Sequence, residues 1–205
     1  MRLYDRYVLP RIVHYTCSTN SLTRQRMKIV PLAEGRVLEV GIGSGLNFPF
    51  YDAAKVTRVW GLDPSRELVG VATEEAKAVP FDVEFMYGGA EDIPLESRSV
   101  DTVVMTYSLC SIPQSVPSLR EMARVLKEGG RLLFCEHGLA PDASVRRWQR
   151  WINPVWRRLG GGCHLNRDIP ALIEEAGFRI EGMETMYLPG WRWANFNYWG
   201  SAVAR

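Results

Sequence analysis

The chain has 205 residues, 46% of them hydrophobic and 23% charged, so it is long enough for one globular domain with a full core. It contains no run of about eighteen apolar residues and no apolar leader segment, so we expect neither a membrane-spanning helix nor a signal peptide. The four cysteines are far apart and the three histidines form no ligand cluster, so we expect free thiols, no metal and a reducing, cytoplasmic location.

The net charge of +2 hides two basic segments. Residues 1–28 contain six Lys or Arg and one acidic residue, and residues 143–167 contain six Arg and no acidic residue. A solvated basic face explains such segments, and so does contact with an anionic partner. Peripheral attachment to a membrane surface is therefore an open alternative.

The first thirty residues are predicted to be helical and to lie outside the sheet, as a cap over one of its edges. After them strand and helix signals alternate, which indicates an α/β fold with a mostly parallel sheet. Two consecutive strands near the C-terminus lack a helix between them, so they must pair antiparallel around Pro189-Gly190 or lie apart. Strands are predicted at 36–41, 57–62, 82–87, 100–107, 130–136, 178–188 and 196–204, and helices at 45–52, 65–78, 115–127 and 168–176.

The segment after the first strand carries the main functional signal. The strand Val37–Val40 contains Glu39 and leads directly into Gly41, Gly43 and Gly45. Glycines let the backbone turn sharply and approach a ligand without a Cβ in the way. The free N–H groups of a helix that starts near Gly45 would then face a carboxylate of that ligand.

Two acidic residues and one leucine indicate which ligand. Asp63 ends the second apolar strand, where an ionised carboxylate can accept both hydroxyls of a ribose. Glu39 is placed to receive an ammonium group, directly or through water. A dinucleotide site of the G-x-G-x-x-G type needs glycine at position 46, where Leu46 stands. Gly-x-Gly-x-Gly behind an acidic residue instead resembles motif I of class I methyltransferases, which bind S-adenosylmethionine (SAM).

Two later stretches extend this resemblance. Residues Gly88–Pro94 follow the third strand, where a methyltransferase binds adenine. Relatives carry an acidic residue just before the alanine that corresponds to Ala90, whereas Gly89 stands there, so Glu91 or the backbone must supply the polar contact. The end of the fourth strand, residues 106–110, is expected to face the transferable methyl group.

From about residue 35 to 137 the chain resembles the SAM-binding core of class I methyltransferases. The resemblance implies one domain over residues 1–205, with a Rossmann-like, seven-stranded, mostly parallel sheet, an antiparallel C-terminal hairpin and helices on both faces. It also implies SAM as cofactor and S-adenosylhomocysteine as product. The cofactor-binding residues expected from it are Glu39, Gly41, Ile42, Gly43, Ser44, Gly45, Asn47, Asp63, Pro64, Ala90, Glu91, Thr106, Tyr107 and Ser108.

A finer resemblance connects the chain to the membrane-associated alkyl thiol methyltransferases of animals. It implies a thiol or sulfide as the small-molecule methyl acceptor. Those proteins carry an apolar N-terminal anchor, whereas this chain has Tyr, Arg and Lys there. The resemblance is carried by Asn47-Phe48, Phe50-Tyr51, Asp63-Pro64, Leu109-Cys110-Ser111, Glu136-His137, Pro154, Trp156, Gly162-Cys163, Leu165 and Arg167.

Two other functions stay open as alternatives. One is methylation of a phospholipid headgroup or quinone at a membrane surface, and the other is a non-catalytic SAM-binding module. Nucleic acid is not expected as a partner, because the Asn/Asp-Pro-Pro-Tyr/Phe signature of amino-methylating enzymes is missing after the fourth strand. The oligomeric state is left open.

A thiol with a pKa of ~8.5 already supplies some thiolate near neutral pH, so its methylation needs little acid–base help. His137, at the end of the fifth strand, is predicted as the general base, with a purely structural role as the alternative. Residues 1–30 and 139–167 are expected to cover the substrate, the latter with an aromatic helical face that Pro154 ends. The predicted substrate-binding residues are Tyr15, Cys110, His137, Trp148, Trp151 and His164.

Overall fold

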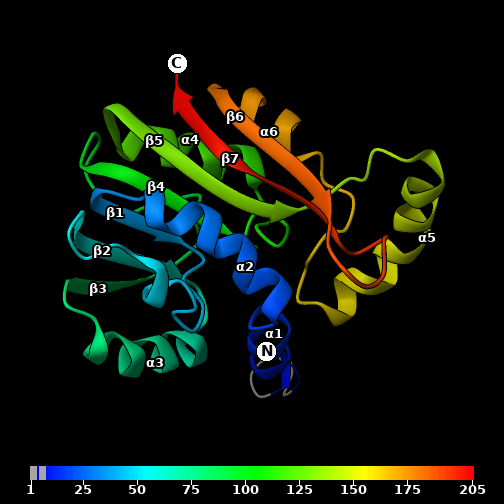
Figure 1. Cartoon of the computed structure of the whole chain (residues 1–205), viewed down its shortest axis with the longest axis horizontal. Coiled ribbons are helices and arrows are strands. Elements are labelled where there is room, and N and C mark those ends of the chain that lie inside the picture. The colour runs from blue at the N-terminus through cyan, green and yellow to red at the C-terminus, as the bar shows by residue number, and fades with distance from the viewer. Residues whose placement is uncertain (1–3, 5–7) are drawn as a thin grey trace.

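The computed structural model describes Tyr4 and residues 8–205. Seven strands form one sheet in the order β3-β2-β1-β4-β5-β7-β6 (Figure 1). The first five strands run parallel, and β7 pairs antiparallel with both β5 and β6, which confirms the predicted sheet and hairpin. The strands are β1 (Gly35–Val40), β2 (Val56–Asp63), β3 (Asp82–Tyr87), β4 (Val100–Thr106), β5 (Leu126–His137), β6 (Phe178–Tyr187) and β7 (Phe196–Ala204).

Most of the predicted helices are present. Asp168 caps the N-terminus of the last one by accepting a hydrogen bond from the backbone N–H of Ala171, as the sequence indicates. The helices are α1 (Leu9–Cys17), α2 (Asn20–Ile29), α3 (Arg66–Glu75), α4 (Ser115–Val125), α5 (Ala143–Leu159) and α6 (Ile169–Glu175), with 3-10 turns η2 (Val30–Leu32), η3 (Phe48–Phe50) and η4 (Ala76–Ala78).

The predicted helix at 45–52 is wrong. The backbone forms consecutive turns there and then only the short η3. Gly45 has a φ of 78°, which a right-handed helix cannot contain, and Pro49 inside η3 has no N–H to donate. The α-helical N-terminus that was expected near Gly45, with its free N–H groups facing a carboxylate of the ligand, is therefore absent from this segment.

Two hydrophobic clusters cover the two faces of the sheet. Leu38 on β1 points to a cluster that includes residues of α4 and α6, whereas its neighbour Val37 points to one that includes residues of α2 and α3. This alternation follows from the two-residue period of a strand. Figure 1 shows α2 in front of the sheet and α4 and α6 behind it, so the predicted helices on both faces are confirmed.

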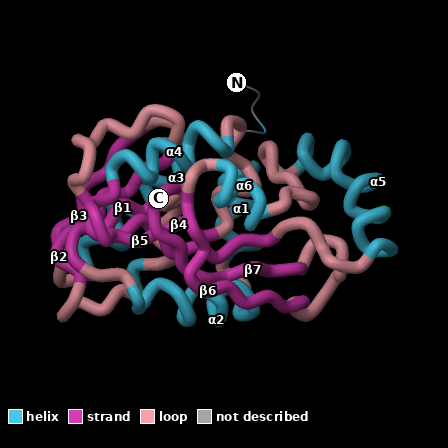
Figure 2. The backbone as a smooth tube through the Cα atoms, turned by 90° about the horizontal axis from the view of Figure 1, so that it is seen from above, coloured by secondary structure: helices cyan, strands magenta, loops and turns pink. Residues whose placement is uncertain are grey.

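The helix α5 lies apart from the sheet, at one end of the molecule in both views (Figures 1 and 2). Pro154 was expected to end this helix, but α5 continues through it to Leu159. Proline has no N–H, so the carbonyl group four residues before Pro154 loses its helical hydrogen bond. Pro154 is exposed, so water can bind this carbonyl group instead, and the free-energy cost of the proline is lower. None of the helices in the described part of the chain combines the length and the apolar character needed to cross a bilayer.

Candidate cofactor and acceptor site

The glycine loop after β1 is held between β2 and the loop that follows β4. The backbone N–H groups of Gly41 and Ile42 both donate to the carbonyl of Leu62, at 2.8 and 3.2 Å. Gly41 has a φ of 76°, and a Cβ built on it would lie 2.4 Å from the Cβ of Ser108. The Ser108 hydroxyl in turn donates to the carbonyl of Val40 at 2.8 Å. Glycine is thus required at position 41 both for its backbone conformation and for space.

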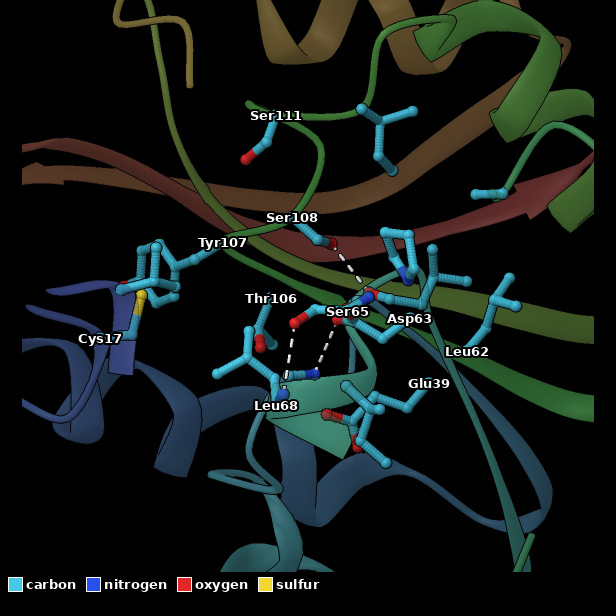
Figure 3. A pocket seen from close by; sticks show the side chains of 18 of the residues that line it. Cys17, Glu39, Leu62, Asp63, Ser65, Leu68, Thr106, Tyr107, Ser108 and Ser111 are labelled. Atoms are coloured by element: carbon cyan, nitrogen blue, oxygen red, sulfur yellow. Dashed lines mark hydrogen bonds between the residues drawn. The ribbon is translucent and has the colours of Figure 1, made fainter. Parts of the chain in front are cut away.

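Asp63, at the end of β2, ties two loops together. Its Oδ2 accepts the N–H of Gly43 at 2.9 Å and its Oδ1 accepts the N–H of Ser65 at 2.8 Å. Burial raises the pKa of Asp63, and the two backbone hydrogen bonds partly oppose this. Each carboxylate oxygen has a further lone pair, and the residue lines a cavity (Figure 3), so it can accept two hydroxyl groups of a ligand.

Glu39 lies deeper, with 2% of its surface exposed. It accepts hydrogen bonds from Asn47 Nδ2 at 2.9 Å and from the Tyr51 hydroxyl at 2.6 Å. Burial raises the pKa of Glu39 to about 7, although both hydrogen bonds lower it. A cationic ligand next to this carboxylate would stabilise its ionised form. Tyr51 matched the family resemblance, but its contact with Glu39 was not predicted.

Thirteen of the fourteen predicted cofactor residues line this one cavity, whose volume is about 570 Å³ and falls in the ordinary range for small-molecule sites. The exception is Gly45, which borders a smaller neighbouring hollow. Glu39, Asp63 and Thr106 come from the ends of β1, β2 and β4, where the carboxyl ends of parallel strands meet (Figure 3). Their roles toward SAM remain predictions.

The other end of the cavity is formed by residues that the sequence analysis did not single out. Leu9, Val13 and Cys17 of α1 line it, and so does Arg26 of α2. The Arg26 guanidinium lies 5.0 Å from the ring centre of Tyr107 and donates to the carbonyl of Cys17 at 2.6 Å. Because α1 and α2 are distant in sequence from the strand ends, no local motif could reveal these contacts.

Three of the predicted substrate-binding residues are exposed and do not line the cavity. Tyr15, Trp148 and Trp151 have exposed fractions of 78%, 62% and 79%. They lie on α1 and α5, and their positions do not support a role in holding a substrate inside the cavity. Their role in substrate binding stays a prediction.

The other three predicted substrate-binding residues, Cys110, His137 and His164, are close together. His137 Nε2 lies 3.2 Å from the sulfur of Cys163, and His164 Nδ1 lies 3.1 Å from the carbonyl of Cys110. None of them is among the described residues that line the cavity. The predicted action of His137 as general base therefore has no direct geometric support.

Glu136, at the end of β5, organises the loop after β4 and is fully buried. Its Oε1 accepts the backbone N–H groups of Ser108 and Leu109 at 2.8 and 3.0 Å. Oε2 has no hydrogen-bond partner in the described part of the chain. Burial raises the pKa of Glu136 to about 7, against the effect of these hydrogen bonds. Glu136 thus fixes the loop that carries Ser108 into the cavity.

Comparison with known proteins places this site in a family context. A family model described as a methyltransferase domain matches residues 38–134. The chain is 38% identical over 150 residues to rat thiol S-methyltransferase TMT1B, covering 71% of this chain and 60% of the relative. It is 32% identical over 179 residues to human thiol S-methyltransferase TMT1A, covering 84% of this chain and 72% of the relative. The chain thus spans less than two thirds of the rat relative.

Several solved structures share the fold, and one of them illustrates the likeness. An N-methyltransferase of Haemonchus contortus, in complex with S-adenosylhomocysteine, superposes with a TM-score of 0.74 and covers 98% of this chain and 59% of its own. Its sequence identity to this chain is 17%, so this likeness shows the fold alone.

Replacing Gly41 with alanine is expected to abolish SAM binding. The new Cβ would collide with Ser108, and alanine disfavours the positive φ at this position. Gly70→Ala in α3 is the matched control, because nothing lies within 4 Å of its Cβ position and alanine favours the helix by up to about 1 kcal/mol. Calorimetric titration with SAM and thermal unfolding measure both effects. Unchanged SAM affinity of Gly41→Ala would contradict the account of this loop.

Replacing Glu136 with glutamine is expected to flatten the pH dependence of stability. The folded-state pKa of Glu136 is raised from 4.5 to about 7, so the folded protein holds this proton more tightly than the unfolded chain. The resulting stabilisation is complete below about pH 4.5 and is lost as the pH rises through 7, an effect on the order of 3 kcal/mol. Glutamine cannot titrate.

Denaturant unfolding at several pH values tests this expectation. Between pH 4.5 and 7 the free energy of unfolding should fall more steeply for the wild type than for Glu136→Gln. The free energy of unfolding of the variant should still fall somewhat with pH, because the pKa of Glu39 is also raised. Glu96→Gln, at an exposed position, is the control and should leave the slope unchanged. Equal slopes for wild type and Glu136→Gln would show that Glu136 is not the titrating group.

Proposed function

The chain belongs to the class I SAM-dependent methyltransferase family, and from this premise we propose that it methylates a small-molecule thiol. The observation that carries the proposal is a cavity with two chemically different sets of lining residues. Glu39 and Asp63 provide carboxylates, whereas apolar residues of α1, Arg26 and Tyr107 form the other set. Figure 3 shows Cys17 and Tyr107 on the side away from Asp63. The names of the rat and human relatives support a thiol as acceptor.

The residues of the first set fit SAM. Glu39 offers a carboxylate to an ammonium group, and Asp63 offers two oxygens to ribose hydroxyls. The Oδ1 atom of Asn47, which also lines the cavity, is buried without a partner in the described chain and can accept a ligand N–H. When bound, SAM would supply an electrophilic methyl group: a bond would form from the thiolate sulfur to the methyl carbon as the bond from that carbon to the sulfonium sulfur breaks, and S-adenosylhomocysteine would leave.

Arg26 is the residue that would favour the reactive form of the acceptor. It is 4% exposed and is the only Arg or Lys among the described residues that line the cavity. Its charge already acts to lower the pKa of the nearby Cys17 thiol and Tyr107 hydroxyl, against the larger effect of burial. The same field would stabilise the thiolate of an acceptor in this space. The apolar side chains of Leu9 and Val13 would hold the acceptor and exclude water.

A thiol-methylation assay with several thiols of different pKa tests this proposal, with release of S-adenosylhomocysteine as the readout. We expect the logarithm of kcat/KM to rise with pH up to the ionisation of each thiol and to shift when the thiol is changed. Arg26→Gln should lower kcat/KM by roughly 10- to 100-fold, the effect of losing one charge-assisted interaction. Arg24→Gln, on the exposed side of the same helix, is the matched control and should leave the rate unchanged.

Turnover of amines or alcohols without turnover of any thiol would overturn the choice of acceptor. SAM binding without transfer to any acceptor would instead indicate a non-catalytic SAM-binding module.

A specific surface feature supports contact with a membrane as a second proposal. Trp148, Trp151, Val155 and Leu159 occupy one face of α5, and each is at least 58% exposed. Such an apolar face with flanking basic residues is typical of helices that lie in a membrane interface. The flanking basic residues are Arg146, Arg147, Arg150, Arg157 and Arg158. This surface would bring the protein to lipophilic acceptors, including a phospholipid headgroup or a quinone.

Vesicle flotation tests this second proposal. The wild type should bind vesicles that contain anionic lipid, and binding should weaken with salt because the arginines contribute to it. The double variant Trp148→Ala/Trp151→Ala should lose at least about 10-fold in affinity, since burial of a large apolar side chain contributes roughly 1.5–3 kcal/mol. Trp191→Ala, at a 68% exposed position in the β6–β7 loop, is the control. Equal flotation of the wild type, the double variant and Trp191→Ala would contradict the proposal, and so would the absence of flotation for all three.

A further inference from the structure

Two cysteines and one histidine meet at the side of the cavity, although the sequence analysis predicted no metal site. Cys110 lies in the loop after β4, His137 ends β5, and Cys163 follows α5. One ligand atom from each residue lies within 4.8 Å of the other two. The two cysteines and the histidine come from separate parts of the chain. No short ligand spacing is therefore visible in the sequence. Within the described residues, both cysteines are free thiols.

We propose that Cys110, His137 and Cys163 bind a thiophilic divalent metal ion, of which Zn²⁺ is the prime candidate. A tetrahedral zinc ion with two sulfur ligands and one nitrogen ligand requires ligand atoms about 3.5–3.8 Å apart. Cys163 Sγ and His137 Nε2 are already 3.2 Å apart. Two thiolates and one neutral imidazole would neutralise the charge of the ion, so the loaded site would carry no net charge in a mostly buried position.

The surrounding structure holds these ligands in place. The backbone N–H of His164 donates to the carbonyl of Cys110 at 2.9 Å, which fastens the segment containing Cys163 to the loop after β4. The indole Nε1 of Trp156 lies 3.3 Å from Cys163 Sγ and donates to it, as outer contacts of metal-bound thiolates do. With Nε2 bound to the ion, the proton of the neutral His137 ring would be on Nδ1, which is buried and has no acceptor in the described part of the chain, so this ligand lacks the outer hydrogen bond that Cys163 has.

Three protein ligands leave one coordination position for water or another ligand. Ser111, which follows Cys110, and Gly161, two residues before Cys163, both line the cavity. The ion would thus lie beside the part of the cavity that we assign to the methyl acceptor. It would connect the loop after β4 to the segment after α5. The proposal concerns the metal site alone and does not depend on the identity of the acceptor.

Titration of the reduced, metal-free protein with Co²⁺, in the absence of SAM, tests the site. We expect one equivalent of Co²⁺ to produce thiolate-to-cobalt charge-transfer absorption and the intense visible bands of tetrahedral Co²⁺, and one equivalent of Zn²⁺ to remove both. Cys110→Ser and Cys163→Ser should lose the charge-transfer band or reduce it by about half. Cys135→Ser is the matched control, because Cys135 is also buried on β5 but is not part of the cluster.

The wild-type protein alone can overturn the proposal, whether or not the variants fold. Weak octahedral Co²⁺ bands without charge transfer would exclude this site. A Cys110–Cys163 disulfide that persists in the purified wild type in the presence of a thiol reductant, seen as a mass lower by two hydrogens, would identify the cluster as a redox pair instead. Circular dichroism of each variant separates loss of ligands from loss of the fold.

Discussion

Buried carboxylates at the carboxyl ends of three parallel strands hold the loops that form the cavity. Asp63 on β2 bonds two loops through backbone N–H groups, and Glu136 on β5 does the same for the loop after β4. Glu39 on β1 is held by two side chains that follow the glycine loop. In each case burial acts against ionisation, and the hydrogen bonds act for it. The geometry of the cavity therefore depends on interactions that are also sensitive to pH.

The strand ends and the glycine loop could be predicted because their signals are local. An apolar run that stops at Asp63 indicates both a strand and its carboxyl end, and a parallel sheet then places such ends along one edge. The predicted helix at 45–52 does not form, because Gly45 adopts a left-handed backbone conformation that a right-handed helix cannot contain. Likewise, Pro154 does not end α5, because the helix tolerates proline at this exposed position.

The part of the cavity that we assign to the acceptor could not be predicted in this way. Arg26, Leu9 and Val13 reach the cavity only because α1 and α2 lie across the sheet edge, and this placement depends on tertiary packing. Ile29 illustrates it, since it anchors α2 in the cluster on one face of the sheet. His14 adds a direct connection to the glycine loop through its 2.7 Å contact with Ser44. The sequence predicts residues 1–30 as a basic helical cap that covers the substrate, but it does not indicate that one of the arginines in this cap, Arg26, is a buried residue of the cavity.

The central claim is that the cavity binds SAM with Asp63 at the ribose. Calorimetric titration of SAM into the wild type and into Asp63→Ala tests it most directly, with Asp52→Ala as a control that lies outside the cavity. Loss of a hydrogen-bonded charge costs about 1.5–3 kcal/mol, so the affinity of Asp63→Ala should fall roughly 10- to 150-fold while that of Asp52→Ala is unchanged. Equal affinities of the wild type and Asp63→Ala, or no SAM binding by the wild type, would contradict the claim.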